Sequence, residues 1–198
     1  METQNLTDSD HQSVLNIIKG LKEDLVTSSN LIFDVGGGEP SLSDGLIEIV
    51  QYCIDNNHPV HINSNGARYV KTFADGANRG LIYLTLTPDA GSQQVHKKIK
   101  GRDNFKKTWE NIKKYMISCQ RMVVVKFILQ DGNLEDIYNM VETSVSAGVR
   151  EIVLSLDLNI RKERHDYFAS HVDLFRIIAK SQRVLVRRSS LLPDYLWK

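Results

Sequence analysis

The sequence is short of cysteine. Of its 198 residues only Cys53 and Cys119 are cysteines, and they lie far apart. Neither belongs to a Cys-x-x-Cys pair or to a cysteine and histidine cluster with metal-ligand spacing. The six histidines are scattered without such spacing as well. We therefore expect two buried thiols, and the sequence predicts no metal centre built from this chain's own side chains.

The sequence also lacks an excess of charge and any long apolar run. Twenty-five Lys and Arg residues are balanced by 24 Asp and Glu, so no overall field favours nucleic acid or an anionic membrane as a partner. No stretch approaches the length of a membrane span, and the N-terminus carries no basic segment leading into an apolar run. We expect a soluble, cytoplasmic protein. The 41% of apolar residues is enough for one core in a single domain over residues 1–198.

What the sequence does contain is a repeated alternation of short apolar runs and amphipathic helical patterns. This alternation is typical of a parallel sheet with helical crossovers. A polar loop is expected after the third strand, before a helix that begins near Asp103. Strands are expected at about residues 31–35, 60–63, 81–87, 122–129, 152–156 and 184–186, and helices at about 8–26, 43–54, 67–78, 103–115, 134–147 and 163–180.

Polar or small residues follow five of the expected strands. In parallel α/β proteins ligands bind at the carboxyl ends of the strands, where loops can vary without disturbing the core. Turn formation is the favoured explanation of any one of these loops, but five of them on one rim favour a binding site there. The loops are residues 36–40, 64–66, 87–91, 130–132 and 157–159.

Two other interpretations were weighed. The glycine run 36–38 could hold a phosphate through its N–H groups, but it lacks both the GxxxxGK[ST] and the GxGxxG spacing. Ser64, Asp89 and His96 are residue types that hydrolases use, yet no Gly-x-Ser-x-Gly elbow presents a nucleophile. Neither a nucleotide loop nor a hydrolase is therefore favoured.

Several of these segments, taken in order, resemble the radical S-adenosylmethionine (SAM) superfamily over roughly residues 7–160. The most specific is Gly37-Gly38-Glu39-Pro40 directly after an apolar strand, which is similar to the family's GGEP motif. Residues 63–66 (Asn-Ser-Asn-Gly) resemble a strand end of the family, and residues 87–91 (Thr-Pro-Asp-Ala-Gly) resemble its Ser-x-Asp-Ala-Gly. A Lys-Ile-x-Gly stretch and two later strands follow the same order, at residues 97–102, 125–128 and 155–157.

The resemblance implies an incomplete TIM-like (βα)6 parallel barrel of the radical SAM type whose first strand is missing. It also implies that backbone and carboxylate groups of the GGEP loop receive the amino group of SAM, because an ammonium needs several oxygen acceptors. The residues that it assigns to SAM binding are Gly37, Gly38, Glu39, Pro40, Asn63, Asn65, Thr87, Asp89, Lys126, Ser155 and Asp157.

Two departures from the family pattern affect the expected activity. Pro88 stands where the family has an aliphatic residue, which removes a backbone donor at a strand end. The family's first strand ends in a CxxxCxxC loop that holds a [4Fe–4S] cluster, and the 35 residues before Gly36 contain no cysteine. We expect weak SAM binding, no catalytic residue that can be named, and a cluster only if the missing strand is supplied.

Two functional hypotheses remain open. The chain is either the SAM-binding core of a radical SAM enzyme, as a truncated or split product that is inactive alone, or a degenerate, non-catalytic α/β module that acts as a partner or regulator. In both cases residues 31–35 form an edge strand that is apolar and free of proline. Such an edge predicts self-association or a partner that donates a strand.

Overall fold

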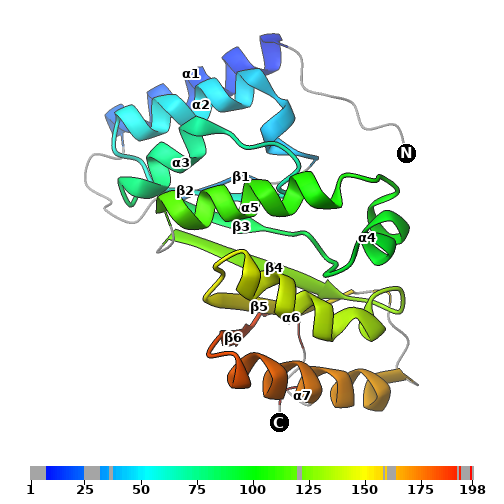
Figure 1. The fold of residues 1–198 in the computed structure, drawn as a ribbon. Coiled ribbons are helices and arrows are strands. Elements are labelled where there is room, and N and C mark those ends of the chain that lie inside the picture. Colours follow the sequence, from blue (N-terminus) through cyan, green and yellow to red (C-terminus); the bar gives the residue numbers. More distant parts are fainter. Residues whose placement is uncertain are drawn as a thin grey trace.

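A computed structural model describes residues 8–24, 32–35, 38–119, 122–157, 159, 164–190, 192 and 197. Within these ranges strands and helices alternate along the chain (Figure 1). The strands are β1 (Phe33–Val35), β2 (Val60–Ser64), β3 (Ile82–Leu86), β4 (Val123–Leu129), β5 (Glu151–Leu156) and β6 (Leu185–Arg188). The helices are α1 (Asp8–Asp24), α2 (Asp44–Asp55), α3 (Lys71–Asn78), α4 (Gln93–Lys100), α5 (Phe105–Cys119), α6 (Ile137–Ser146) and α7 (His165–Ser181), with 3-10 turns η1 (Pro40–Leu42) and η3 (Leu134–Asp136).

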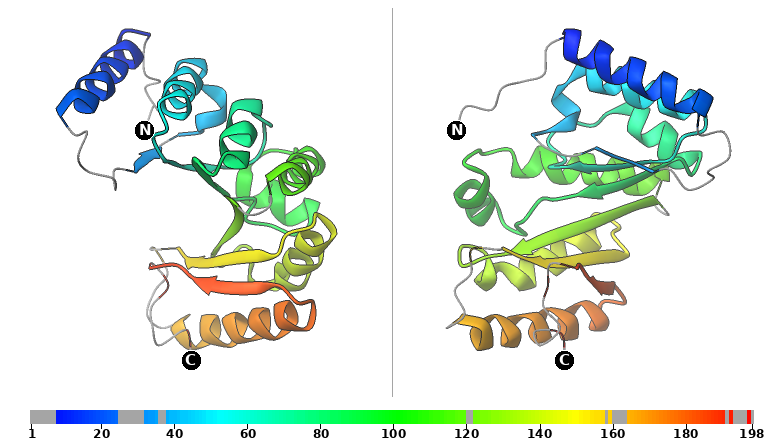
Figure 2. Two further views of the ribbon diagram at one scale, coloured as in Figure 1. Left: turned by 90° about the vertical axis from the view of Figure 1, so that its left-hand side faces the viewer. Right: turned by 180° about the vertical axis from the view of Figure 1, so that it is seen from behind.

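The six strands form one sheet in which every neighbouring pair is parallel and the order in space is the order in sequence, β1 to β6. The sheet is curved. The helices lie along its convex side, with α1 outside α2, and the described helices leave the concave side uncovered (Figure 2). The expected incomplete TIM-like (βα)6 parallel barrel is confirmed. In the described part of the chain, β1 pairs only with β2 and is therefore an edge strand.

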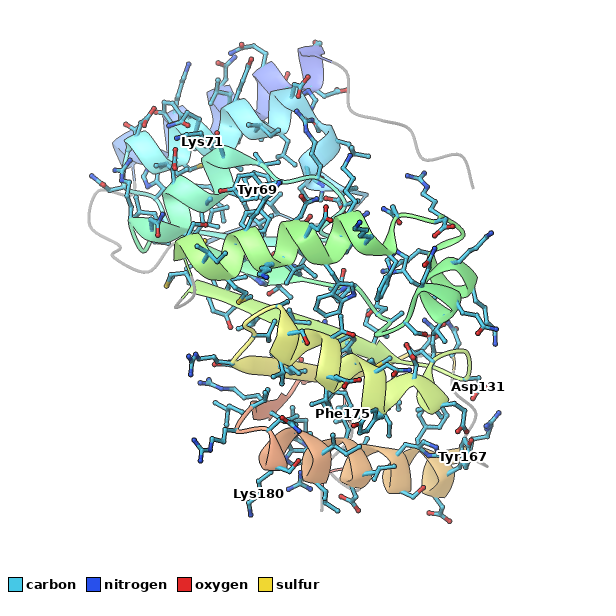
Figure 3. All side chains as sticks on the ribbon, in the orientation of Figure 1. Tyr69, Lys71, Asp131, Tyr167, Phe175 and Lys180 are labelled. Carbon is cyan, nitrogen blue, oxygen red and sulfur yellow. The ribbon has the colours of Figure 1, made fainter. Side chains whose placement is uncertain are left out.

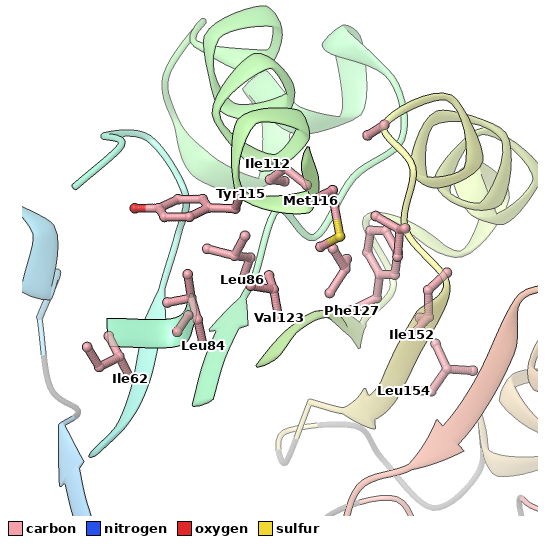
Figure 4. Packing of buried hydrophobic residues seen from close by; sticks show 14 of the residues in the cluster. Ile62, Leu84, Leu86, Ile112, Tyr115, Met116, Val123, Phe127, Ile152 and Leu154 are labelled. Atoms are coloured by element: carbon pink, nitrogen blue, oxygen red, sulfur yellow. The ribbon is translucent and has the colours of Figure 1, made fainter. Parts of the chain in front are cut away.

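The core lies between the sheet and the helices on its convex side. Alternate strand residues such as Ile62, Leu84 and Phe127 point toward the helices and are completely buried (Figure 4). Each of them removes an apolar side chain from water, which stabilises the fold by about 1.5 to 3 kcal/mol. From the last helix, Phe175 points into this layer while Lys180 points away from it (Figure 3).

The observed elements differ from the expected ones in two places. The segment expected to be a polar loop contains α4, whose only apolar residues, Val95 and Ile99, are too few to mark a helix although they stand four residues apart. Its Ile99 side chain packs against Gly132, and Gly101 ends the helix at φ 65°. The helix expected at 67–78 begins only at Lys71.

Two further expectations concern the ends of elements and membrane spans. Ser43 caps α2, which begins where the sequence predicts a helix, because its hydroxyl accepts a hydrogen bond from the N–H of Leu46 at 3.3 Å. Leu31, Gly36 and Gly37, at the ends of the first expected strand, lie outside the described residues. Among the helices that the structure describes, none is long and apolar enough to cross a membrane.

Candidate functional site

The candidate site is the rim of the sheet at which all strands end. Because the strands are parallel, their carboxyl ends lie at the same edge, and α4 lies beyond the ends of β3 and β4 (Figure 1). The loops at this rim carry most of the residues that the sequence assigns to a ligand. Together with the uncovered concave face, they form the open side of the molecule.

The loop after β1 is held in place by Glu39. One carboxylate oxygen, Oε1, accepts hydrogen bonds from the Ser64 hydroxyl at 2.7 Å and the Ser41 N–H at 3.1 Å. The other, Oε2, accepts from the N–H of Asn65 at 2.7 Å. Glu39 therefore ties the first loop to the end of β2, and both of its oxygens already bond within the chain.

Gly38, the residue before Glu39, provides the open part of the same loop. It has φ 57°, a left-handed conformation that favours glycine, and no other atom lies within 4 Å of the position that a Cβ would take. Its backbone is therefore accessible to a ligand. Pro40 begins the turn η1 behind the loop. Gly37 lies outside the described residues.

The end of β2 forms a second ordered loop. The side-chain oxygen of Asn65 accepts a hydrogen bond from the N–H of Ala67 at 2.8 Å, and Gly66 takes φ 74°. From α5, the buried Asn111 donates to the carbonyl of Gly66 at 3.0 Å. The first two loops of the rim are thus built as one unit around Glu39.

Asp89 organises the rim after β3. Its side chain is only 6% exposed and accepts from the ammonium group of Lys100 at 2.6 Å and from the N–H of Ile128 at 2.8 Å. Burial raises the pKa of Asp89, while Lys100 and the more distant Lys126 act in the opposite direction. Asp89 is therefore a buried, paired group that joins α4 to β4, and it is not free to reach a ligand.

The loop after Asp89 lies directly against α6. The N–H groups of Gly91 and Ser92 donate to the Asp136 carboxylate at 2.7 and 3.0 Å. A Cβ on Gly91 would lie 2.0 Å from the nitrogen of Met140, so only glycine allows this approach. The Asp-Ala-Gly sequence thus fixes the rim by close backbone packing.

The remaining residues assigned from sequence lie along the concave face or at its rim. On β2, Asn63 pairs in register with Thr85, and Lys126 lies half-buried on β4. Ser155 is buried, and its hydroxyl has no hydrogen-bond partner among the described residues. Asn63 and Lys126 are partly exposed on the concave face, whereas the Ser155 hydroxyl is closed off from solvent.

Thr87 and Asp157, which were also assigned from the sequence, form hydrogen bonds with other residues of the rim. Thr87 donates its N–H to the carbonyl of Ser64 at 2.9 Å, which joins β3 to β2 at the rim. Asp157 accepts from the N–H and the side-chain amide of Asn159, each at 3.0 Å. Neither residue contacts the Glu39 loop through a hydrogen bond in the described ranges.

Sequence reasoning assigned no role to several residues that shape the rim. Asn133 donates its amide to the carbonyls of Asp89 and Ile128, each at 2.9 Å, and Asp136 holds the Gly91 loop. Lys100 lies within the basic stretch that marks the resemblance, but its partner Asp89 could not be identified from spacing. Asn133 and Asp136 could have been found from the sequence by the Asn-x-x-Asp spacing just after β4.

The two cysteines do not suit an iron–sulfur cluster. Cys53 lies buried on α2 and Cys119 lies buried on α5. Burial raises the pKa of the Cys53 thiol to about 11 and raises that of Cys119 as well. A cluster needs several thiolates close together, and the described residues contain no group of three His, Cys, Asp or Glu that could hold a metal ion.

Comparisons with known proteins agree with this geometry. A model of the radical SAM superfamily matches residues 7–143. A probable GTP 3',8-cyclase of Saccharolobus islandicus is 27% identical over 175 residues, which is 84% of this chain and 56% of that protein. A probable GTP 3',8-cyclase of Saccharolobus solfataricus is 29% identical over 81% of this chain and 53% of its own length. The chain spans about half the length of these curated relatives.

Solved structures share the fold at low sequence identity. SuiB of Streptococcus suis, crystallised with S-adenosylmethionine, superposes with a TM-score of 0.71 at 11% identity, over 96% of this chain and 45% of SuiB. A domain of a pyruvate-formate lyase-activating enzyme from Bacteroides vulgatus superposes with a TM-score of 0.60 at 17% identity, over 82% of this chain and 100% of that domain. These similarities concern the arrangement of the strands and helices.

Proposed function

Because the chain belongs to the radical SAM superfamily, we propose that its concave face and rim form the SAM-binding core of such an enzyme, and that the chain does not supply its own [4Fe–4S] cluster. The observation that carries this proposal is the loop at Gly38, which presents open backbone at the rim and is fixed by Glu39 to the end of β2. SAM is the group that the family uses, and the radical chemistry belongs to SAM and the cluster together.

The residues at the rim suit a ligand with both an ammonium and a carboxylate group. Backbone carbonyls near Gly38 can accept from the ammonium, since the Glu39 oxygens are already in use. Lys126 supplies a positive charge on the same open face for the carboxylate. The Ser155 hydroxyl is buried and takes no part in this contact. In this proposal Glu39 and Asp89 position the loops, and the ligand contacts Gly38, Asn63 and Lys126.

The cluster does not fit the cysteines of this chain, so we propose that SAM binding is weak and that no radical forms unless a cysteine strand comes from outside this sequence. Without iron the ligand loses the bonds through its amine and carboxylate. We expect a dissociation constant in the high micromolar range or weaker, about −5 kcal/mol of binding free energy. The curated relatives are named as probable GTP 3',8-cyclases. A contribution of this chain to a similar reaction belongs to the same proposal.

Titration calorimetry with SAM tests the binding site. We compare the wild-type chain with Gly38→Val and, as a control, with Gly80→Val. Both glycines have positive φ and no atom within 4 Å of the position that a Cβ would take, but Gly80 precedes β3, at the other end of the sheet. Loss of binding in Gly38→Val alone supports the proposal. Equal binding in all three chains would place the ligand elsewhere.

Anaerobic reconstitution with iron and sulfide tests the cluster. We expect no cluster absorbance and no cleavage of SAM after reduction. Uptake of about four irons per chain with formation of 5′-deoxyadenosine would overturn this part. The second candidate is a non-catalytic module that acts as a partner or regulator, which the burial of both cysteines favours. A wild-type chain that binds no SAM would support this module and refute the SAM-binding core.

A further inference from the structure

Three polar side chains form a line across the concave face, on β1, β2 and β3. Asp34 Oδ1 lies 3.3 Å from His61 Nδ1, and His61 Nε2 lies 3.0 Å from Thr85 Oγ1. Asp34 and His61 are direct register partners. The ring of Tyr83, the register partner of His61 on the other side, lies 5.6 Å from the imidazole between centroids. The imidazole is therefore held on both sides in one orientation.

The partners define which ring nitrogen carries the proton. Asp34 Oδ1 lies at ion-pair distance from Nδ1, and a carboxylate can only accept a hydrogen bond, so Asp34 favours the form of the ring that carries its proton on Nδ1. In the neutral ring Nε2 is then the acceptor, and the hydroxyl of Thr85 donates to it. Carboxylate, imidazole and hydroxyl thus stand in the order of a catalytic triad. In such a triad the carboxylate orients the histidine, and the histidine takes the proton of the hydroxyl.

A fourth residue lies beside this line. Asn63 is the register partner of Thr85 and lies on the same face of the sheet, and its side chain forms no hydrogen bond with another described residue. Its side-chain amide can donate to an oxygen that develops negative charge next to Thr85. The side chains of Asp34 and His61 are 69% and 29% exposed and Thr85 is 5% exposed, so a small molecule reaches the buried hydroxyl only past the His61 end of the line.

We propose that Thr85 is an activated hydroxyl in an acyl-transfer site, with His61 as its base, Asp34 as the residue that orients His61, and Asn63 as the donor to the carbonyl oxygen. The site takes a small uncharged ester. Thr85 Oγ1 bonds to the carbonyl carbon while its proton moves to His61 Nε2, and the departing alcohol takes that proton as the carbon–oxygen bond breaks. Water then bonds to the carbonyl carbon while its proton moves to His61 Nε2. The bond from that carbon to Thr85 Oγ1 breaks as Oγ1 takes the proton, which releases the acid and restores Thr85. The site shares Asn63 with the proposed SAM-binding face but does not rest on that proposal.

The test follows release of nitrophenolate from p-nitrophenyl acetate by the full chain. We expect the rate to fall at least about tenfold in His61→Asn and Thr85→Val, and less in Asp34→Asn and Asn63→Ala. Thr85→Ser keeps the hydroxyl and should retain activity. His58→Asn is the matched control, because His58 is a partly buried histidine outside the line.

Mass spectrometry of acid-quenched protein should find an acetyl group on Thr85 in the wild type and on no equivalent peptide in Thr85→Val. Thermal melting of every variant separates loss of the site from loss of the fold. A wild-type rate no higher than buffer, or an acetyl group found only on surface lysines, would overturn the proposal. Folded His61→Asn and Thr85→Val variants with the wild-type rate would show that the line only ties three strands together.

Discussion

The ion pair between Asp89 and Lys100 should be the most sensitive electrostatic contact of the rim. We consider Lys100→Met, which keeps much of the apolar stem and removes the charge. Loss of one partner of a fully buried pair costs about 3 to 5 kcal/mol, because the other charge stays buried without compensation. Here the side chains of Lys100 and Asp89 are 25% and 6% exposed, so water screens part of the effect. We expect a loss of about 2 to 3 kcal/mol in the free energy of unfolding.

This loss should also depend on pH in a defined direction. Burial raises the pKa of Asp89 and Lys100 opposes that rise, so removing Lys100 raises the pKa further. A carboxyl group whose folded-state pKa is raised stabilises the fold below its ordinary pKa, where it is protonated, and this contribution is lost as pH rises through the raised pKa. The deficit of Lys100→Met relative to wild type should therefore grow from acidic to neutral pH.

Urea and thermal denaturation followed by circular dichroism measure both effects. For a chain of this length the expected loss corresponds to a melting temperature lower by about 4 to 12 °C. Lys97→Met on the same helix is the control, because Lys97 is exposed and forms no ion pair with a described residue. If Lys100→Met and Lys97→Met melt together at neutral pH, or if the deficit shrinks as pH rises, the reasoning about Asp89 is wrong.

Three other predictions concern the rim and the edge of the sheet. Gly91→Ala should lose about 3 kcal/mol in urea denaturation, because its Cβ would meet the α6 backbone at 2.0 Å; unchanged stability would contradict this. Glu39→Gln should cost about 1 to 3 kcal/mol and loosen the Gly38 loop, as measured by amide hydrogen exchange. Light scattering should detect self-association through β1, and Ile32→Lys should reduce it, since Ile32 is 63% exposed. Phe33→Lys is not a suitable alternative, because it would damage the core against which Phe33 packs.

Most of the fold could be predicted from the sequence because the strands have a strong local signal. Each of the six apolar runs became a strand of the sheet, since β-branched and apolar residues facing the helices cannot remain in water. The helix α4 was missed because only Val95 and Ile99 carry apolar surface, and tertiary packing of Ile99 on Gly132 stabilises it. That contact joins segments more than thirty residues apart, and no local pattern indicates it.

The candidate site was predicted in outline only. Sequence order placed Glu39, Asn65 and Asp89 at one rim, and parallel pairing confirms that placement. Their contacts could not be predicted: Glu39 was expected to contact a ligand, and no pattern indicated that its oxygens bond to the end of β2. Likewise the line of Asp34, His61 and Thr85 exists only in the observed register. A shift of one residue would turn His61 to the helix side of the sheet.

The strand order has a consequence for how this chain folds during synthesis. Each strand pairs with the strand made just before it, so no strand has to be inserted between two that are already paired. Pairing partners are separated by one crossover, which contains one helix or, between β3 and β4, two, and this keeps the entropy of loop closure small for every step. The sheet can therefore grow from β1 toward β6 as the chain leaves the ribosome, with N-terminal units docked before C-terminal ones exist. At every stage the most recently made strand is the temporary edge, and the next strand to emerge covers it.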